Sequence, residues 1–359
     1  MSINEIIVYI MAVFMVLGAV DRIIGNKFGL GEPFEEGILA MGSLALSMIG
    51  IISLAPVLAG ILRPVVVPLF DLVGADPAVF AGTILANDMG GAPLAMELAR
   101  TEEAGRFGGL IVGAMLGPTI VFTIPVALGI IKAEDRPALA RGVLAGIITI
   151  PIGSFVGGIV AGFPVLMVLR NLIPIVLIAV LIAVGLWLAP NGMVKGFQVF
   201  GRIIVILITV GLGAAIVEEL TGIVLIRGLA ALEEGFQTVG SIAIVLAGAF
   251  PLVHVITKVF RKPLLKLGGL LGMNDKAAAG MVATLANNIP MFGMLHEMDE
   301  RGKIINVAFA VSAAFVFGDH LGFTAGFDET MIFPMIVGKL VGGVTAVAVA
   351  MFLTRKGKK

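Results

Sequence analysis

The chain has 359 residues, of which 59% are hydrophobic and only 13% are charged, whereas soluble domains carry about 25% charged residues. Its 24 basic and 24 acidic residues give a net charge of zero, so no basic surface points to nucleic acid as a partner. It has no cysteine, which excludes disulfides and thiolate metal sites.

Eleven apolar segments follow one another along the chain, and about 20 apolar residues suffice for a helix to cross a membrane. In chain order they are residues 6–20, 38–61, 78–99, 110–131, 142–163, 172–189, 203–217, 238–256, 277–295, 304–323 and 331–353. The first is preceded by Glu5 and by no basic region, so we expect a retained helix and not a cleaved signal peptide. The pattern predicts an all-α polytopic protein whose surroundings are the lipid bilayer.

The two halves of the chain share short sequence words in the same order. Residues 34–37 (FEEG) recur as 232–235 (LEEG), and 85–88 (LAND) recur as 285–288 (LANN), at offsets of 198 and 200 residues. This regular offset indicates an internal duplication with five apolar segments in each half. The predicted division is a first transmembrane repeat at 1–165, a linker helix at 166–196 and a second repeat at 197–359.

The distribution of basic residues predicts how the segments cross. Lys276 precedes segment 277–295 and Arg301 follows it, so by the positive-inside rule both ends belong on the cytoplasmic side. That segment is therefore expected to enter the membrane and return, as is its counterpart 78–99 from the other side. Nine spanning helices and two re-entrant segments result, which makes the repeats antiparallel, as in many secondary transporters. The C-terminus is predicted to be cytoplasmic, in a bacterial inner membrane.

Polar side chains inside the apolar segments are the candidates for contact with a solute. An Asp at the centre of a membrane helix costs about 2.5–3.5 kcal/mol, so such residues usually line a hydrated path or have a partner. The candidate pathway residues are Asn87, Asp88, Thr119, Thr123, Asn287, Asn288, Asp319 and His320. Pro118 and Gly318 are expected to break the helices nearby. The alternative is that the amides and hydroxyls only bond neighbouring helices and that Asp319 neutralises Lys339.

Motifs of membrane enzymes are missing from the sequence. It contains no HExxH, no GxSxG, no aspartate-rich diphosphate site and no P-loop. We therefore predict that the protein is not an enzyme and that it uses no cofactor and no metal.

Three long stretches resemble one known family. They are 81–91 (AGTILANDMGG), 279–294 (AGMVATLANNIPMFGM) and 318–323 (GDHLGF). Through them, and nearly end to end, the chain is similar to the ethanolamine-utilisation transporter family, EutH. The resemblance implies a permease or facilitator that supplies ethanolamine to a catabolic pathway inside the cell.

Ethanolamine at neutral pH is mostly a small ammonium ion with a hydroxyl group. Asp88 or Asp319 would suit its nitrogen and the asparagines its oxygen, while Phe122, Phe292 and Phe323 offer aromatic faces for a cation–π contact. Other readings stay open: an ion-coupled carrier of another amine, a carboxylate or a nucleoside, or an intramembrane enzyme or receptor. Proton coupling through His320 and a homo-oligomeric state are likewise open.

Overall fold

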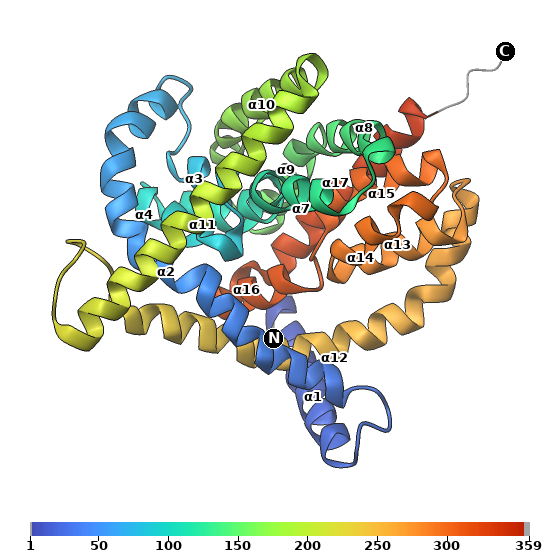
Figure 1. The fold of residues 1–359 in the computed structure, drawn as a ribbon, viewed down its shortest axis with the longest axis horizontal. Helices are drawn as coiled ribbons and strands as arrows, with labels where there is room; N and C mark the ends of the chain where they lie inside the picture. The colour runs from blue at the N-terminus through green and yellow to red at the C-terminus, as the bar shows by residue number, and fades with distance from the viewer. Residues whose placement is uncertain (1, 355–359) are drawn as a thin grey trace.

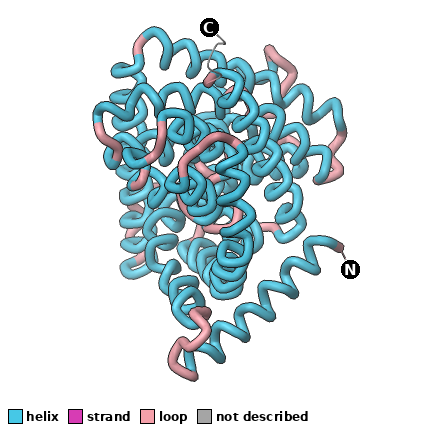
Figure 2. Tube along the Cα trace, turned by 90° about the vertical axis from the view of Figure 1, so that its right-hand side faces the viewer, coloured by secondary structure: helices cyan, strands magenta, loops and turns pink. Residues whose placement is uncertain are grey.

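The computed structural model describes residues 2–354, and within that range every regular element is a helix. Figure 2 shows the helices joined by short loops, with the N-terminal helix at the edge of the molecule. Eight helical segments of the described chain are long and apolar enough to cross a membrane. They are Ile3–Ile23, Gly31–Asp71, Glu102–Ile130, Ala133–Val160, Val165–Leu186, Lys195–Thr221, Leu232–Val259 and Glu329–Leu353. The expected multi-pass, all-helical class is confirmed.

Two long helices, α2 (Gly31–Asp71) and α12 (Leu232–Leu270), pack against each other, and α1 (Ile3–Ile23) contacts both (Figure 1). The glycines of the repeated FEEG and LEEG words lie at the α2–α12 contact. A Cβ on Gly37 would lie 2.5 Å from the backbone nitrogen of Ala247, and one on Gly235 would lie 2.7 Å from Ile49. Because only glycine permits these approaches, the repeated word marks where the helices touch.

Segments 78–99 and 277–295 are both broken and both close on themselves. The first forms α3 (Ala78–Ile84), η1 (Asn87–Met89) and α4 (Gly91–Leu98), and the second forms α13 (Asp275–Ala286) and α14 (Ile289–Gly293). An ion pair of 2.6 Å joins Arg100, which follows the first segment, to Asp71 at the end of α2, and one of 2.7 Å joins Lys276 and Glu297, which flank the second. The flanks of each segment therefore lie close together, as in the predicted hairpins.

The remaining helices surround these broken segments (Figure 1). Between α4 and α8 the chain forms α5 (Glu102–Arg106), η2 (Phe107–Ile111), η3 (Val112–Ala114), α6 (Leu116–Pro118), η4 (Thr119–Thr123), α7 (Ile124–Ile130) and η5 (Ala133–Asp135). Then follow α8 (Arg136–Ile147), α9 (Ile150–Val160), α10 (Val165–Leu188) and α11 (Pro190–Thr221). The C-terminal part contains η6 (Leu295–Glu297), α15 (Glu300–Ala313), α16 (Asp319–Phe327), η7 (Glu329–Met331) and α17 (Ile332–Leu353).

One segment expected to span as a single helix, 304–323, is divided into α15 and α16. Phe315 adopts a left-handed backbone conformation with φ of 64°, which an α-helix cannot contain. Its N–H donates to the carbonyl oxygen of Thr284 at 3.1 Å, and the N–H of Phe317 donates to that of Leu285 at 2.9 Å. Bonds to α13 thus replace the helical bonds at this break. The count of nine spanning helices and the inverted repeat stay predictions, and the basic tail 355–359 lies outside the described residues.

Candidate functional site

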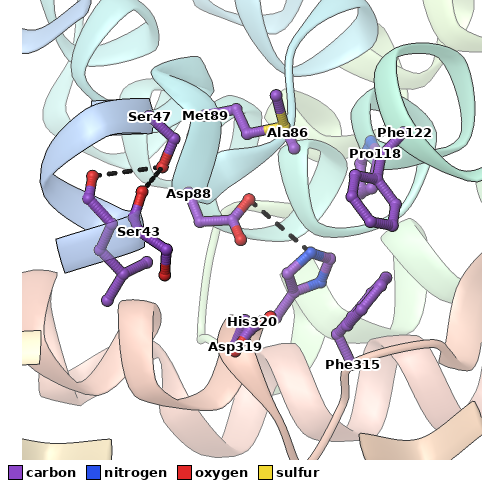
Figure 3. Close-up of a pocket in the computed structure, with 11 residues that line it drawn as sticks. Ser43, Ser47, Ala86, Asp88, Met89, Pro118, Phe122, Phe315, Asp319 and His320 are labelled. Carbon is purple, nitrogen blue, oxygen red and sulfur yellow. Dashed lines mark hydrogen bonds and ion pairs between the residues drawn. The ribbon is translucent and has the colours of Figure 1, made fainter. Parts of the chain in front are cut away.

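A cavity of about 270 Å³ lies where the chain breaks meet (Figure 3). Its walls come from the middle of α2, from the break before α4, from the turn around Pro118 and from the start of α16. The lining residues are Ser43, Leu44, Ser47, Ala86, Asp88, Met89, Pro118, Phe122, Phe315, Asp319 and His320. Four of the residues predicted from the sequence share this cavity: Asp88, Phe122, Asp319 and His320. Asp88 and His320 are more than 230 positions apart in the chain.

The break that carries Asp88 follows from local sequence. Helix α3 ends at Ile84, the next residue Leu85 is extended, and a single 3₁₀ turn presents Asp88 before Gly90 reverses the chain with φ of 88°. A Cβ on Gly90 would lie 2.2 Å from the side chain of Ile51 on α2, so this glycine serves both the turn and the packing. The carboxylate of Asp88 consequently stands beside α2 and not inside a regular helix.

Glycines hold each break against the next helix at matching positions. A Cβ on Gly117 would lie 1.9 Å from the carbonyl oxygen of Leu85, and one on Gly318 would lie 2.1 Å from that of Ala286. These two glycines begin a further pair of words that correspond between the halves of the sequence, 117–122 (GPTIVF) and 318–323 (GDHLGF). Backbone therefore packs directly on backbone at both places, which positions Asp88 beside the turn at Pro118 and Asp319 beside the end of α13.

The polar side chains form a short chain from the cavity into the protein. The Asp88 Oδ1 atom lies 3.9 Å from Nε2 of His320, and Nδ1 of His320 lies 3.0 Å from Nζ of Lys339. Lys339 on α17 is 1% exposed, and its ammonium also donates to the carbonyl oxygen of Ala114 in η3. The expectation that Asp319 neutralises Lys339 is not met, since the direct side-chain partner of Lys339 is His320. Figure 3 shows Asp88 and His320 pointing toward each other across the cavity.

Two phenylalanines form the opposite wall. The rings of Phe122 and Phe315 meet edge to face with centroids 5.5 Å apart, and the ring of Phe315 lies 5.1 Å from that of His320. Of the three predicted aromatic contacts, only Phe122 lies in this cavity. Phe292 is buried elsewhere, and Phe323 stacks on Phe327 at 5.3 Å. Phe315, Ser43 and Ser47 were not anticipated, because nothing in their sequence surroundings distinguishes them from packing residues.

Some of the predicted amide and hydroxyl side chains bond neighbouring helices, and others do not. Thr119 donates to the carbonyl oxygens of Met115 and Val311, and Asn288 donates to the hydroxyl of Thr123 at 3.1 Å. These three side chains join helices, as the alternative interpretation expected. The fully buried amide of Asn87 has no hydrogen-bond partner.

Asn287 lines a second cavity of about 310 Å³. Its lining residues are Pro33, Glu36, Phe250, Val253, His254, Thr257, Ala286, Asn287, Phe317, Gly318 and Asp319. Asp319 belongs to the linings of both cavities, so its carboxylate stands at the boundary between them.

Comparison with known proteins gives full-length matches. The family described as "Ethanolamine utilisation protein, EutH" matches residues 3–353. The chain is 68% identical to a protein of Listeria monocytogenes serotype 1/2a (strain 10403S) named "Probable ethanolamine permease EutH", covering 100% of the chain and 96% of the relative. It is 53% identical to the Escherichia coli (strain K12) protein of the same name, covering 99% and 97%. The "Uncharacterized protein YxeR" of Bacillus subtilis (strain 168) is also 53% identical, covering 99% and 96%. No solved structure matches significantly.

Proposed function

Because the chain belongs to the ethanolamine utilisation protein EutH family, we propose that it is a permease that carries ethanolamine across a membrane. The names of the relatives from Listeria monocytogenes and Escherichia coli describe a permease, which supports a transporter. One observation carries the proposal to this chain: a small cavity, enclosed by broken helices of a multi-pass protein, is lined by two carboxylates.

The chemistry of the cavity matches both ends of ethanolamine. Its ammonium would bind between Asp88 and Asp319, since hydrogen bonds between ionised partners are about twice as strong as neutral ones. The hydroxyls of Ser43 and Ser47 already donate to backbone carbonyls of α2, at 2.9 and 3.1 Å, which leaves their oxygens free to accept the O–H of the solute. The ring of Phe122 would add a cation–π contact of about 0.5–2 kcal/mol.

The two cavities suggest a route. We propose that the solute passes between them at Asp319, with the repeats 1–165 and 197–359 rocking against each other around the linker 166–196. The closed ends of segments 78–99 and 277–295 support re-entrant hairpins that reach the site from opposite sides. In a bacterial inner membrane with a cytoplasmic C-terminus, the second cavity, beside Thr257 and the basic end of α12, would face the cytoplasm.

Uptake of labelled ethanolamine into proteoliposomes tests the proposal. The wild-type protein is expected to load vesicles above the level of protein-free vesicles, and excess unlabelled ethanolamine, but not acetate or a nucleoside, should block this uptake. A carboxylate carrier would show the reverse pattern of competition. The absence of any uptake above protein-free vesicles would refute the proposed function.

Variants then test the site. Asp88→Asn and Asp319→Asn should each lower uptake at least tenfold, because each removes one negative charge from the cavity. The matched control is Asp275→Asn, which changes an exposed aspartate at the start of α13. Wild-type rates in both cavity variants would show that the ammonium binds elsewhere.

A further inference from the structure

Phe315 lines the first cavity from a backbone conformation that an aromatic residue rarely adopts. Its φ is 64°, in the left-handed region, and the residue is only 4% exposed. In this region the Cβ of an L-residue crowds its own backbone, so the conformation persists only where the surroundings impose it. Backbone strain of this kind is concentrated at functional sites, which marks Phe315 as more than a packing residue.

The second broken segment holds the backbone of Phe315 in place. The N–H groups of residues 315 and 317 donate to the carbonyl oxygens of Thr284 and Leu285, at 3.1 and 2.9 Å. A Cβ on Gly318 would lie 2.1 Å from the carbonyl oxygen of Ala286, so backbone also packs on backbone there. Because these contacts follow one another along the last turn of α13, this part of the cavity wall cannot move unless α13 moves with it.

The ring of Phe315 is held from two sides as well. The ring of Phe122, from the first half of the chain, meets it edge to face at 5.5 Å, and the ring of His320 in α16 lies 5.1 Å away. In a close-packed interior a ring between two others turns aside only if a neighbour moves first. Phe315 is therefore a rigid wall, and a rigid wall can select a solute by size.

The wall lies at one end of the cavity. His320, which contacts the ring of Phe315, also faces Asp88, with 3.9 Å between its Nε2 atom and Oδ1 of Asp88. In Figure 3 the phenylalanine rings and the two serines, Ser43 and Ser47, lie on opposite sides of Asp88. A solute with its oxygen at the serines and its nitrogen at Asp88 would therefore direct any substituent of the nitrogen toward the rings.

We propose, on the basis of the proposed function, that Phe315 determines specificity by excluding amino alcohols whose nitrogen carries an alkyl group. A secondary amine keeps an N–H that can bond a carboxylate, so Asp88 and Asp319 alone would accept it. Discrimination against it must come from shape, and the wall of Phe315 and Phe122 supplies that shape. The solute class that passes is the unsubstituted primary amino alcohol.

Competition between two isomers tests this proposal. Uptake of labelled ethanolamine into proteoliposomes is measured against unlabelled 2-(ethylamino)ethanol, which has an ethyl group on the nitrogen, and against 1-amino-2-butanol, which has it on the carbon that bears the hydroxyl. For the wild type, 2-(ethylamino)ethanol should compete at least about tenfold less well than ethanolamine, since one or two extra carbons in a rigid apolar site cost about that much. Equal competition by the two would overturn the proposal without any variant.

Phe315→Gly is the sharpest variant, because it removes the ring and also relieves the left-handed backbone. The deficit of 2-(ethylamino)ethanol should shrink to about threefold or less, while the standing of 1-amino-2-butanol relative to ethanolamine should stay as in the wild type. Phe327→Ala is the matched control, since Phe327 is a partly buried aromatic residue that belongs to the lining of neither cavity, and it should keep the wild-type selectivity.

A purely structural role for Phe315 predicts a different pattern. General loosening of the cavity would improve competition by both isomers alike, and either that result or unchanged selectivity in Phe315→Gly would overturn the proposal. If Phe315→Gly does not fold, Phe122→Leu decides, because it removes the supporting ring and should relax selectivity toward the same isomer. Absence of ethanolamine uptake by the wild type would overturn the proposed function, whereas uptake without discrimination would overturn only this inference.

Discussion

Replacing Gly117 by alanine would disturb the contact that positions Asp88. The added Cβ would lie 1.9 Å from the carbonyl oxygen of Leu85 and 2.3 Å from its carbon, whereas real Cβ contacts are essentially never shorter than 3.0 Å. Both partners are backbone, so no side chain can rotate away, and the two segments must separate by about 1 Å in a close-packed interior.

The expected loss follows from this displacement. Overpacking of this kind costs about 1–3 kcal/mol, which exceeds the gain of about 0.5–1 kcal/mol that Gly→Ala gives in an unobstructed helix. Leu85 is three residues from Asp88, so the displacement also moves the carboxylate, and a misplacement of about 1 Å at a reacting site can cost about 100-fold in activity. We therefore expect a lower melting midpoint and a larger fall in ethanolamine uptake.

The assay compares Gly117→Ala with Gly129→Ala, since a Cβ on Gly129 in α7 would meet nothing within 4 Å. Melting midpoints are measured in detergent by size-exclusion chromatography after heating, and uptake is measured in proteoliposomes. Gly129→Ala should match the wild type in both. If Gly117→Ala melts and transports as Gly129→Ala does, the close approach of the two breaks is not needed and the reasoning fails.

Three further predictions concern stability. Lys303→Met should cost about 3–5 kcal/mol of unfolding free energy, measured by denaturant titration, because it removes the ammonium 2.6 Å from the buried carboxylate of Asp135 and leaves only the ring of His296, 3.4 Å away, beside it. Phe315→Gly should be more stable than Phe315→Ala by about 1–2 kcal/mol in the same assay, since glycine adopts the left-handed conformation freely. The hydrogen bond and positive charge of Lys276 lower the pKa of Glu297. The pair therefore stabilises the fold above the ordinary pKa of glutamate, and this stabilisation is lost as the pH falls through the lowered pKa. Melting midpoints of wild type and Glu297→Gln should differ at pH 7 and converge in acid.

Each of these predictions has a control. Arg141→Met removes an exposed side chain 4.0 Å from Glu300, and it should change stability by no more than about 0.5 kcal/mol. An equally small effect of Lys303→Met would contradict the buried pair. Equal stability of the two Phe315 variants would show that this position carries no backbone strain, and a pH-independent difference for Glu297→Gln would remove the ion pair as its cause.

The sequence predicted the helix breaks well where they have a local chemical cause. Segments 78–99 and 277–295 were expected to turn back, and both are interrupted where Asn87 and Asp88 precede two glycines and where Asn287 and Asn288 precede a proline. Asp88 and Asp319 could also be predicted, because a charged residue within an apolar segment stands out in the sequence.

The sequence could not predict which residues of a helix face the cavity, because this depends on how the helices pack. Phe122 and Phe323 occupy corresponding places in the two repeated words, yet one lines the cavity and the other stacks on Phe327. The left-handed conformation of Phe315 has no sequence signal, since aromatic residues rarely adopt it. It is imposed by the bonds that the end of α13 receives from residues 315 and 317. The partner of Lys339 likewise depends on packing between α16 and α17.

The position of the bound solute tests the central claim most directly. A structure of the wild-type protein determined in saturating ethanolamine should show the solute in the first cavity, with its nitrogen within hydrogen-bonding distance of Asp88 or Asp319 and its oxygen toward Ser43 or Ser47. Ethanolamine bound outside both cavities, with the Asp88 and Asp319 carboxylates unoccupied, would contradict the account.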